Sequence, residues 1–570
     1  MKTTAKHLMA FAISIVYILF VHFFMGIYFS TNDDRFMGEL LSGAITGSFD
    51  THLVYVNYLL ALPLSLLYRI TTDVSWFGIL LVLFHWLSCF CILDSFYSKA
   101  KTKTDIAIST ILTALLFITE LYLISQISYT MTASFMAVAG YVCLLLHENK
   151  KFRFVSFILL ELFALLLRDK AMLMVQPLGF AVYFGLTLKE SANTLKTNIF
   201  KIVKTGVFLI GILIIGFIGN KIGYSGNDWQ TYQAYNDART TLFDYSEFLP
   251  YEEVSHILEK YEVSEIDYNA YAEYAILDYK LSLDCVEELA DFMKTKEQSA
   301  SLSSVLNDFK TFTFQEQYWQ ANTIVIIGWL CTVIFLLLSG NFRGFVPLIC
   351  LLAARTVIWF YLLYEGRLPL RVSMPLFACE VVLLWTIIFY YYRSKQHYVK
   401  WQKFSFIAIG FILCVVSLWS AKIQFVNFRQ MNEVQKIYIN GLHDVYDYCD
   451  NHPKNKYILD TLSFIWYNGE SFDGSLYGKR NCITAGSWLS NAPTLLKGNE
   501  EYLSDTKDGF YFIMFSEFED TDEEMNHPIV KYLAKESGST PQITDSFIAS
   551  HGGIYSVIYF EGELKLNTNP

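Results

Sequence analysis

Charged residues are scarce in this sequence of 570 residues: Asp, Glu, Lys and Arg make up 17% of it, whereas hydrophobic residues make up 54%. Long apolar runs recur, which excludes an ordinary soluble protein. Acidic residues outnumber basic ones, and the formal net charge is −11. An acidic surface argues against binding to nucleic acid and against docking on anionic lipid headgroups. We therefore predict a polytopic membrane protein that is mainly α-helical and binds no nucleic acid.

Cysteine motifs and repeats are also missing. The ten Cys include no CxxC pair and no Cys/His spacing typical of a metal site, and most of them lie within apolar runs. Cys449 and Cys482 share one hydrophilic block, so a disulfide between them stays open if that block is extracytoplasmic. The sequence has no evident internal repeat and no low-complexity segment. The repeat symmetry common in transporters is therefore lacking.

Apolar runs of bilayer length predict about eleven spans. The first, at 7–29, lacks the small-residue cleavage site of a signal peptide, and we expect a retained anchor. Residues 51–70 are too polar for a full span and predict a juxtamembrane helix. The other spans are expected near residues 75–95, 105–124, 128–147, 153–167, 171–188, 203–222, 321–339, 344–363, 372–392 and 404–422.

Basic residues give the orientation of these spans. With the N-terminus in the cytoplasm, the cytoplasmic loops hold clustered Lys and Arg, and the opposite loops are acidic or mixed, as the positive-inside rule requires. Beyond the last span, the sequence predicts a helical stretch through about Cys449. Strand-like runs then alternate with loops rich in Gly, Asn and Asp; these runs are KYILDTLSFIWY from residue 456, GFYFIMFS and IYSVIYFEGEL. Four regions follow: an N-terminal transmembrane module (1–222) with its first external loop at 30–74, an acidic helical extracytoplasmic insertion (223–320), C-terminal transmembrane helices (321–422) and a small extracytoplasmic α/β domain (423–570).

An acid pair, Asp33 and Asp34, follows the first span. Carboxylates are costly to desolvate at a membrane surface, so such a pair either faces water or serves a site. Two readings remain: a solvated cap that ends the span, or the centre of a site for a substrate held partly in lipid. Polar residues nearby favour the site, and those we expect to line it are Arg35, His52 and Asn57.

Cations at the outer ends of later spans are candidates for binding a phosphate. External cations are uncommon under the positive-inside rule, and guanidinium groups suit phosphate, although anchoring at the interface is the alternative. The candidates are Arg168, Lys170, Arg367 and Arg371. Glu120, near the outer end of its span, either joins this external site or is an interfacial Glu in water. Deeper in the bilayer, Arg355 and Glu380 are expected at similar depth and predict an ion pair.

Two polar stretches outside the spans also contain aromatic residues. They are YNDARTTLFDY at 235–245 and the turn-rich stretch around Trp488. A Trp suits stacking on a sugar face, but a buried Trp is commoner in a small domain. Neither stretch specifies a function by itself.

The acid pair after the first span, the Gly-containing segment that follows it, and the Gly366-Arg367, Arg371 and Pro375 pattern resemble the GT-C superfamily of integral membrane glycosyltransferases. The likeness is to the protein O-mannosyltransferase and aminoarabinose-transferase branch, and it covers roughly residues 7–190 and 345–390. It implies a GT-C-like bundle in which Asp33 or Asp34 is the catalytic base. The implied donor is a sugar on a polyprenyl phosphate, and the implied acceptor is a cell-envelope glycan, lipid or protein.

The sequence departs from that branch in one motif. The Lys-Pro-Pro that follows the acidic loop there is absent, so a lipid-A-type substrate is not implied. Paired acids also bind Mg²⁺ or Mn²⁺ readily, although the resemblance does not require a metal. A transporter or flippase for a lipid-linked glycan is the alternative function, favoured by the intramembrane charges, and a surface-binding protein anchored by its spans is a third. Polar residues gathered in external loops favour the transferase.

Overall fold

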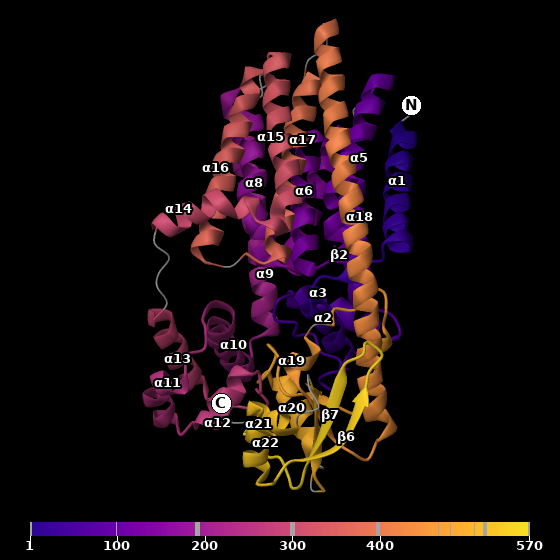
Figure 1. The fold of residues 1–570 in the computed structure, drawn as a ribbon. Helices are drawn as coiled ribbons and strands as arrows, with labels where there is room; N and C mark the ends of the chain where they lie inside the picture. Colours follow the sequence, from indigo (N-terminus) through magenta and orange to yellow (C-terminus); the bar gives the residue numbers. More distant parts are fainter. Residues whose placement is uncertain are drawn as a thin grey trace.

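The structure is a computed structural model that describes residues 3–98, 100–188, 194–296, 302–366, 368–394, 399–465, 467–478, 480–504, 506, 508–516 and 521–567. These residues are mostly helical, and they form a bundle of long helices with a globular part at one end (Figure 1). The N-terminus lies at the far end of the bundle, and the C-terminus lies in the globular part.

Ten helices in the described part of the chain are long and apolar enough to cross a membrane. They are α1 (Thr3–Phe24), α4 (Trp76–Ser98), α5 (Lys103–Ser125), α6 (Tyr129–Leu146), α8 (Asp169–Leu188), α9 (Leu195–Gly223), α15 (Trp319–Ser339), α16 (Phe345–Tyr364), α17 (Leu370–Ser394) and α18 (Lys400–Asn451). The chain is therefore a multi-pass membrane protein, as predicted. The eleventh expected span, at 153–167, corresponds to α7 (Lys150–Leu167), whose 18 residues include four charged ones and which is not among the ten.

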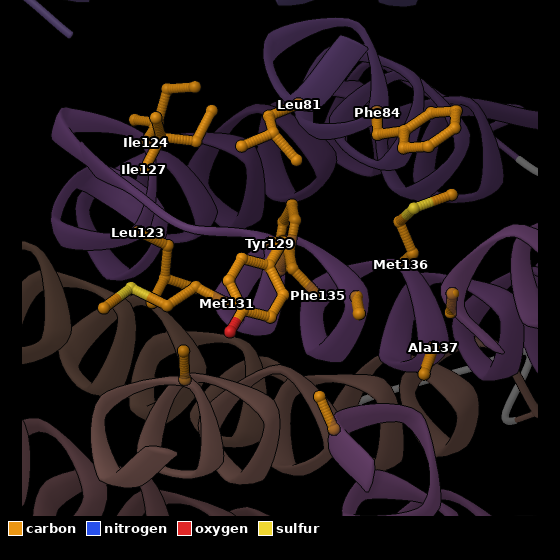
Figure 2. Close-up of a cluster of buried hydrophobic side chains, with 14 of the residues drawn as sticks. Leu81, Phe84, Leu123, Ile124, Ile127, Tyr129, Met131, Phe135, Met136 and Ala137 are labelled. Atoms are coloured by element: carbon orange, nitrogen blue, oxygen red, sulfur yellow. The ribbon is translucent and has the colours of Figure 1, made fainter. Parts of the chain in front are cut away.

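Helix α6 is the centre of the bundle. All 18 of its residues are buried inside the protein, and it packs against α4, α7, α8 and α17. Small residues such as Ala133, Ala137 and Gly140 let neighbouring helices approach closely, which matters in a bilayer where lipid is as apolar as the helix faces. Figure 2 shows apolar side chains of α4, α5 and α6 packed around Tyr129 and Phe135.

Two short helices, α2 (Asn32–Ser42) and α3 (Tyr58–Tyr68), lie between the bundle and the globular part (Figure 1). Helix α3 falls within the predicted juxtamembrane segment. Just before α2, strand β1 (Tyr28–Phe29) pairs in parallel with strand β2 (Gln126–Ile127). This pairing holds the start of α2 against the connection between α5 and α6.

The segment that follows α9 is helical, and its residues from Tyr235 to Met293 form a hydrophobic core to which Leu496 of the C-terminal part also belongs. Its helices are α10 (Asn227–Tyr245), α11 (Tyr251–Leu258), α12 (Glu265–Ala272), α13 (Leu283–Lys296) and α14 (Leu302–Thr311). The described residues also include five short 3₁₀ turns: η1 (Glu259–Tyr261), η2 (Phe312–Phe314), η3 (Glu316–Tyr318), η4 (Phe342–Gly344) and η5 (Ser475–Tyr477).

The C-terminal part holds a five-stranded sheet with the order β4-β3-β5-β7-β6. Strands β4, β3 and β5 are parallel, and β5, β7 and β6 are antiparallel. The strands are β3 (Tyr457–Leu459), β4 (Ile483–Thr484), β5 (Phe510–Ser516), β6 (Gln542–Ile548) and β7 (Ile554–Phe560), and the helices are α19 (Thr461–Phe464), α20 (Pro493–Leu503), α21 (Thr521–Asn526) and α22 (Pro528–Ser537). The strand-like run from residue 456 ends early because Asp460 caps α19, accepting the N–H of Ser463 at 2.9 Å.

Helix α18 joins the bundle to the sheet. Its 52 residues are about 78 Å long, far more than the roughly 30 Å of a bilayer core. The sequence predicted a span at 404–422 with a separate helical stretch after it, and the structure makes one continuous helix. The side chain of buried Asn432 accepts from Gln126 (2.7 Å) and donates to the carbonyl of Met25 (2.7 Å). These bonds fasten α18 to the ends of α1 and α5.

Two predicted pairs of side chains have different outcomes. The Arg355 Nε lies 2.7 Å from Glu380 Oε1, which confirms the predicted ion pair inside the bundle. The alternative that Cys449 and Cys482 form a disulfide is not realised, because all ten cysteines are free thiols in the structure.

Candidate functional site

Asp33 and Asp34 lie in the first turn of α2, where the bundle meets the globular part. The preceding Thr31 has an extended backbone (φ −141°, ψ 157°), and the helix ends at Gly43, whose φ of 77° is a left-handed conformation that glycine adopts without strain. The helix dipole favours carboxylates in such a first turn. A solvated cap does not describe Asp34, however, because its side chain is completely buried.

Asp33 forms an ion pair with Arg371, in which Oδ2 and Nη1 are 2.5 Å apart. Arg371 belongs to the first turn of α17, and its Nη1 also lies 3.5 Å from the hydroxyl oxygen of Thr31. The two partners are 338 residues apart in the sequence. Their side chains remain 15% and 23% exposed. The structure therefore brings a predicted base and a predicted phosphate ligand into contact while both stay partly accessible.

Asp34 is held by two hydrogen bonds. Its Oδ1 accepts from the backbone N–H of Tyr129 (2.8 Å), and its Oδ2 accepts from the hydroxyl of Thr31 (2.9 Å). Burial raises the pKa of this carboxyl to about 7; the two hydrogen bonds oppose the rise, and the negative charge of Asp33 adds to it. Asp34 thus connects α2 to the first residue of α6, and its charge changes near neutral pH.

Arg168, which follows α7, lies beside this ion pair. Its guanidinium carbon is 4.8 Å from the ring centroid of Tyr55 and 5.5 Å from that of Tyr129, distances typical of cation–π contacts. Tyr129 interacts electrostatically with Asp33 and Arg371 as well as with Arg168. Two carboxylates, Asp33 and Asp34, and two guanidinium groups therefore share a single neighbourhood around Tyr129.

Aromatic side chains from distant segments surround Tyr55. The ring of Trp488, from the C-terminal part, lies 4.8 Å from that of Tyr55 and 5.2 Å from that of Phe36. Burial raises the pKa of Tyr55, and the positive charge of nearby Arg239, from α10, opposes this rise. The hydroxyl of Tyr232, also on α10, donates to the Trp488 carbonyl (3.0 Å). Both aromatic stretches that the sequence singled out thus reach the site.

Arg35 is directed toward the C-terminal part. Its Nε lies 3.3 Å from Glu39 Oε1, and the same oxygen is 3.0 Å from Nη2 of Arg480. Burial alone raises the pKa of Glu39, but the two guanidinium groups hold it below its usual value. Arg480 also stacks on Tyr446 of α18, 4.0 Å from the ring centroid. The structure thus places Arg35 in a buried charge cluster that fastens α2 to the C-terminal part.

His52 and Asn57 fasten the loop between α2 and α3. The His52 Nδ1 lies 2.8 Å from Asp50 Oδ1, and its ring stacks on Trp229 with 4.1 Å between centroids. Burial alone raises the pKa of Asp50, but the hydrogen bond with His52 contributes to holding it below its usual value. Asn57 donates to the carbonyl of Gly216 on α9 (2.8 Å). These contacts use both predicted binding residues to hold the loop against α9 and α10.

The remaining predicted residues do not join the acid pair. Glu120 is buried within the bundle and pairs with His85 of α4 (2.7 Å), because an ionisable group in lipid is costly without a partner. Lys170 is exposed at the start of α8, and Arg367 lies outside the described residues. Of the predicted phosphate ligands that the structure describes, Arg168 and Arg371 are the ones beside Asp33.

The two adjacent aspartates of α2 have different partners, since Asp33 pairs with Arg371 and Asp34 accepts the Tyr129 N–H. Within the described parts of the chain, neither belongs to a group of three or more potential metal ligands. Binding of Mg²⁺ or Mn²⁺ by the pair stays a prediction.

Sequence reasoning missed Glu39 and Arg480. The i,i+4 spacing of Arg35 and Glu39 is a signal for an ion pair on α2. Arg480, however, lies 441 residues from Glu39, and no local sequence pattern predicts a contact between residues so far apart in the chain. No protein-family model, curated protein or solved structure matches this chain. Its function is therefore argued from the chemistry of the site.

Proposed function

We propose that the chain is a membrane glycosyltransferase, which moves a sugar from a polyprenyl-phosphate donor to a hydroxyl of a cell-envelope glycan, lipid or protein. The observation that carries the proposal is the Asp33–Arg371 ion pair at the end of the bundle, with Arg168 beside it. A carboxylate and two guanidinium groups supply what displacement at a sugar phosphate needs, a proton acceptor and a binding site for phosphate. A polyprenyl tail stays in lipid, so a site at the end of a membrane bundle suits such a donor.

In the proposed reaction, the Asp33 carboxylate accepts the proton of the acceptor hydroxyl as the hydroxyl oxygen attacks the anomeric carbon. A new C–O bond forms on one face of that carbon while its bond to the phosphate oxygen breaks on the other, which inverts the configuration. The leaving polyprenyl phosphate takes the bonding electrons, and Arg371 and Arg168 stabilise its charge. Because a guanidinium group has five N–H donors, Arg371 can contact Asp33 and the phosphate together.

We assign the base to Asp33 and a positioning role to Asp34. A base must lie within hydrogen-bonding reach of the acceptor hydroxyl, and the Asp33 side chain is 15% exposed. Asp34 is buried, and both of its oxygens already accept hydrogen bonds. Burial also raises the pKa of Asp34 to about 7, a value that suits a base, so the experiment compares the two residues directly.

The site is assigned to the extracytoplasmic side of the membrane. The support is the distribution of Lys and Arg, which cluster in the loops at the opposite end of the bundle. In this orientation residues 423–570 are a small extracytoplasmic α/β domain, and Trp488 brings it over the site beside Tyr55. Two aromatic rings next to a carboxylate suit packing against a sugar ring.

The test is turnover by the reconstituted full-length chain, followed as release of polyprenyl phosphate from a panel of lipid-linked sugars. We expect Asp33→Asn to lower turnover by about 10²- to 10⁴-fold and Arg371→Gln by about 10²- to 10³-fold. Asp34→Asn is expected to lower it by less than about tenfold, since geometry and not proton transfer is affected. The matched control is Asp169→Asn, which removes an exposed carboxylate next to Arg168 and leaves turnover unchanged.

Four other outcomes of this experiment would change the proposal, each in a different way. If Asp34→Asn abolishes turnover and Asp33→Asn does not, the roles of the two carboxylates are exchanged. If neither substitution lowers turnover, the proposed base is wrong. Loss of turnover with a chelator, restored by Mg²⁺ or Mn²⁺, would add a metal to the mechanism. Movement of lipid-linked glycan across a vesicle membrane, without any release of polyprenyl phosphate, would favour the flippase.

A further inference from the structure

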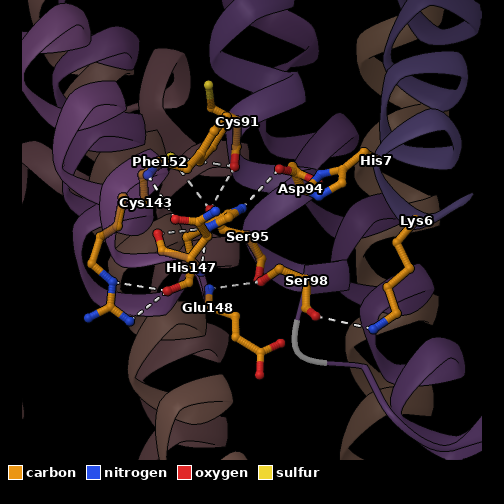
Figure 3. A network of polar contacts seen from close by, with 12 residues as sticks. Lys6, His7, Cys91, Asp94, Ser95, Ser98, Cys143, His147, Glu148 and Phe152 are labelled. Atoms are coloured by element: carbon orange, nitrogen blue, oxygen red, sulfur yellow. Dashed lines mark hydrogen bonds and ion pairs between the residues drawn. The ribbon is translucent and has the colours of Figure 1, made fainter. Parts of the chain in front are cut away.

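Figure 3 shows a second cluster of ionisable side chains, which lies near the start of α1, at the end of the bundle opposite to α2 in Figure 1. It joins His7 near the start of α1, Asp94 near the end of α4, and His147, which follows α6. The His7 Nδ1 is 2.5 Å from Asp94 Oδ1, and the His147 Nε2 is 3.0 Å from Asp94 Oδ2. Helix α1 runs roughly 26 Å from His7 to Phe24, so this cluster is remote from the site of the proposed transfer.

We propose that His7, Asp94 and His147 bind a divalent transition metal ion, with Zn²⁺ as the best match. Two imidazole nitrogens and one carboxylate oxygen are the donor set of zinc sites with three protein ligands, which keep a fourth position for water. The three ligand atoms all lie within 4.8 Å of one another. An ion at about 2.0 to 2.2 Å from each therefore needs only small side-chain movements.

The charge of Asp94 favours a cation at this place. Asp94 is completely buried and His147 is 2% exposed, and a buried carboxylate is costly unless it is paired. Within the described residues, the ion pairs of Asp94 are both with these histidines. The basic side chains of Lys6 and Arg153 donate to carbonyl oxygens, of Ser98 and His147 respectively. A divalent ion between the imidazoles would neutralise Asp94 directly.

The second nitrogen of each imidazole allows the change of tautomer that metal binding needs. The His147 Nδ1 lies 3.1 Å from the backbone nitrogen of Asn149, whose N–H it accepts, and 3.4 Å from the Asn149 carbonyl oxygen. With Nε2 on the metal, the ring proton moves to Nδ1, which then gives up the Asn149 N–H that it accepts here and can donate instead to the Asn149 carbonyl, a usual second partner of a metal-bound histidine. The His7 side chain is 38% exposed, so water can accept a hydrogen bond from the N–H of its other ring nitrogen.

Bound metal would fasten the first helix to the rest of the bundle. The ligands come from separate segments, with His7 87 residues and His147 53 residues from Asp94, so local sequence spacing does not reveal the cluster. Only 28% of the residues in the membrane-length stretch of α1 are buried, and its contacts are mainly with α4 and α5 along one face. A metal bridge from α1 to α4 and α6 adds a constraint there. This role is independent of the proposed glycosyl transfer.

The test uses full-length, tag-free protein in detergent, stripped of metal by a chelator and titrated with ZnCl₂ by calorimetry. The proteins compared are wild type, His7→Asn, His147→Asn, and His22→Asn as a control that removes a half-buried histidine from the same helix α1. We expect one Zn²⁺ per chain for wild type and the control, and at least about 100-fold weaker binding for the other two. Zn²⁺ should also raise the unfolding temperature of wild type but not of His7→Asn.

His7→Asn is the more informative variant, because position 7 is partly exposed and an Asn amide can still donate to Asp94. An unfolding temperature close to that of metal-free wild type will show that this variant folds. If wild type fails to bind Zn²⁺ in a one-to-one ratio, the metal site is wrong. Equal binding by wild type and His7→Asn would overturn it too, because the ion would then be held elsewhere. In both cases the cluster is a hydrogen-bonded brace between helices.

Discussion

The backbone N–H of Tyr129 and the hydroxyl of Thr31 occupy the two oxygens of Asp34, whereas Asp33 faces Arg371. Consecutive residues of an α-helix point about 100° apart, and this rotation directs one carboxylate toward α6 and the other toward α17. The buried carboxylate of Asp34 holds α2 in place, and the partly exposed carboxylate of Asp33 can contact a substrate. Two adjacent residues of one type therefore have separate roles that follow from burial.

Asp34 should make the stability of the folded chain depend on pH. Burial raises its pKa to about 7, whereas a carboxyl of an unfolded chain has an ordinary value near 4. Between these values the folded chain retains a proton that the unfolded chain has lost, so stability falls as the pH rises from about 4 to about 7. Asp34→Asn removes this cost, which amounts to at most roughly 4 kcal/mol at neutral pH, and flattens the profile. Thermal unfolding of both proteins at pH 5 and pH 8 measures the difference.

Wild type has to be compared with Asp34→Asn because a second buried carboxyl also makes the stability of the folded chain fall as the pH rises. Burial raises the pKa of Asp278 to about 6, so wild type loses some stability over this pH range even without Asp34. The Asn amide at position 34 can still accept the Tyr129 N–H and donate to Thr31, which keeps the fold. Asp169→Asn, at an exposed position, should leave the profile unchanged. Parallel profiles for wild type and Asp34→Asn would show that Asp34 does not cause the dependence.

At the scale of elements, the position of α2 depends on Glu39, whose carboxylate lies between Arg35 and Arg480. Glu39→Gln leaves two buried guanidinium groups without a compensating charge, and we expect a loss of about 3–5 kcal/mol in the free energy of unfolding. Thermal or denaturant unfolding in detergent measures this loss. The control is Glu501→Gln in α20, whose partner Lys497 is 3.9 Å away and whose side chain is 72% exposed.

An exposed i,i+4 pair of this kind is worth at most about 1 kcal/mol, so the control should unfold close to wild type. Equal losses for Glu39→Gln and Glu501→Gln would mean that the buried cluster does not brace α2. A loss confined to Glu39→Gln should also lower turnover in the proposed transfer, because α2 carries Asp33. Unfolding and turnover, measured together, therefore distinguish a buried charge that positions α2 from a surface charge that does not.

The membrane helices could be predicted because apolar composition is a local property of the chain. The span expected at 128–147 is α6, Tyr129–Leu146, and the one expected at 171–188 lies within α8, Asp169–Leu188. Helix α18 was expected in two pieces because hydropathy falls near residue 422. Helical hydrogen bonding nevertheless continues through the polar residues to Asn451, where the sheet-containing part begins.

The site could be predicted only in part, because its contacts join distant residues. Asp33 and Arg371 were each suggested by a local pattern, but no spacing reports a contact across 338 residues. Glu120 was expected near the external site, and its actual partner is His85, 35 residues earlier in the chain. Packing of α4 against α5 brings these two together, and that packing is not readable from either helix alone.

At the scale of the whole molecule, the helices that carry the proposed transfer site and the proposed metal site place them at opposite ends of one bundle (Figure 1). The Asp33–Arg371 pair lies at the end that carries the globular part, and the His7–Asp94–His147 cluster lies at the other. The orientation of the bundle in the membrane therefore decides which compartment each cluster faces. A lipid-linked donor and a cell-envelope acceptor meet on the extracytoplasmic side, so the proposed transfer requires one orientation only.

Labelling of introduced cysteines tests this orientation. Lys497→Cys replaces a side chain that is 77% exposed in the globular part, and Lys101→Cys replaces an exposed lysine in the connection after α4, at the end that holds His7. The positive-inside rule puts the lysine-rich end in the cytoplasm, so a membrane-impermeant maleimide should label Lys497→Cys in intact cells. Lys101→Cys should react only after permeabilisation, with wild type giving the background from its own ten cysteines. The reverse pattern would place Asp33 and Arg371 in the cytoplasm, where an extracytoplasmic acceptor cannot reach them, and the proposed transfer would fail with it.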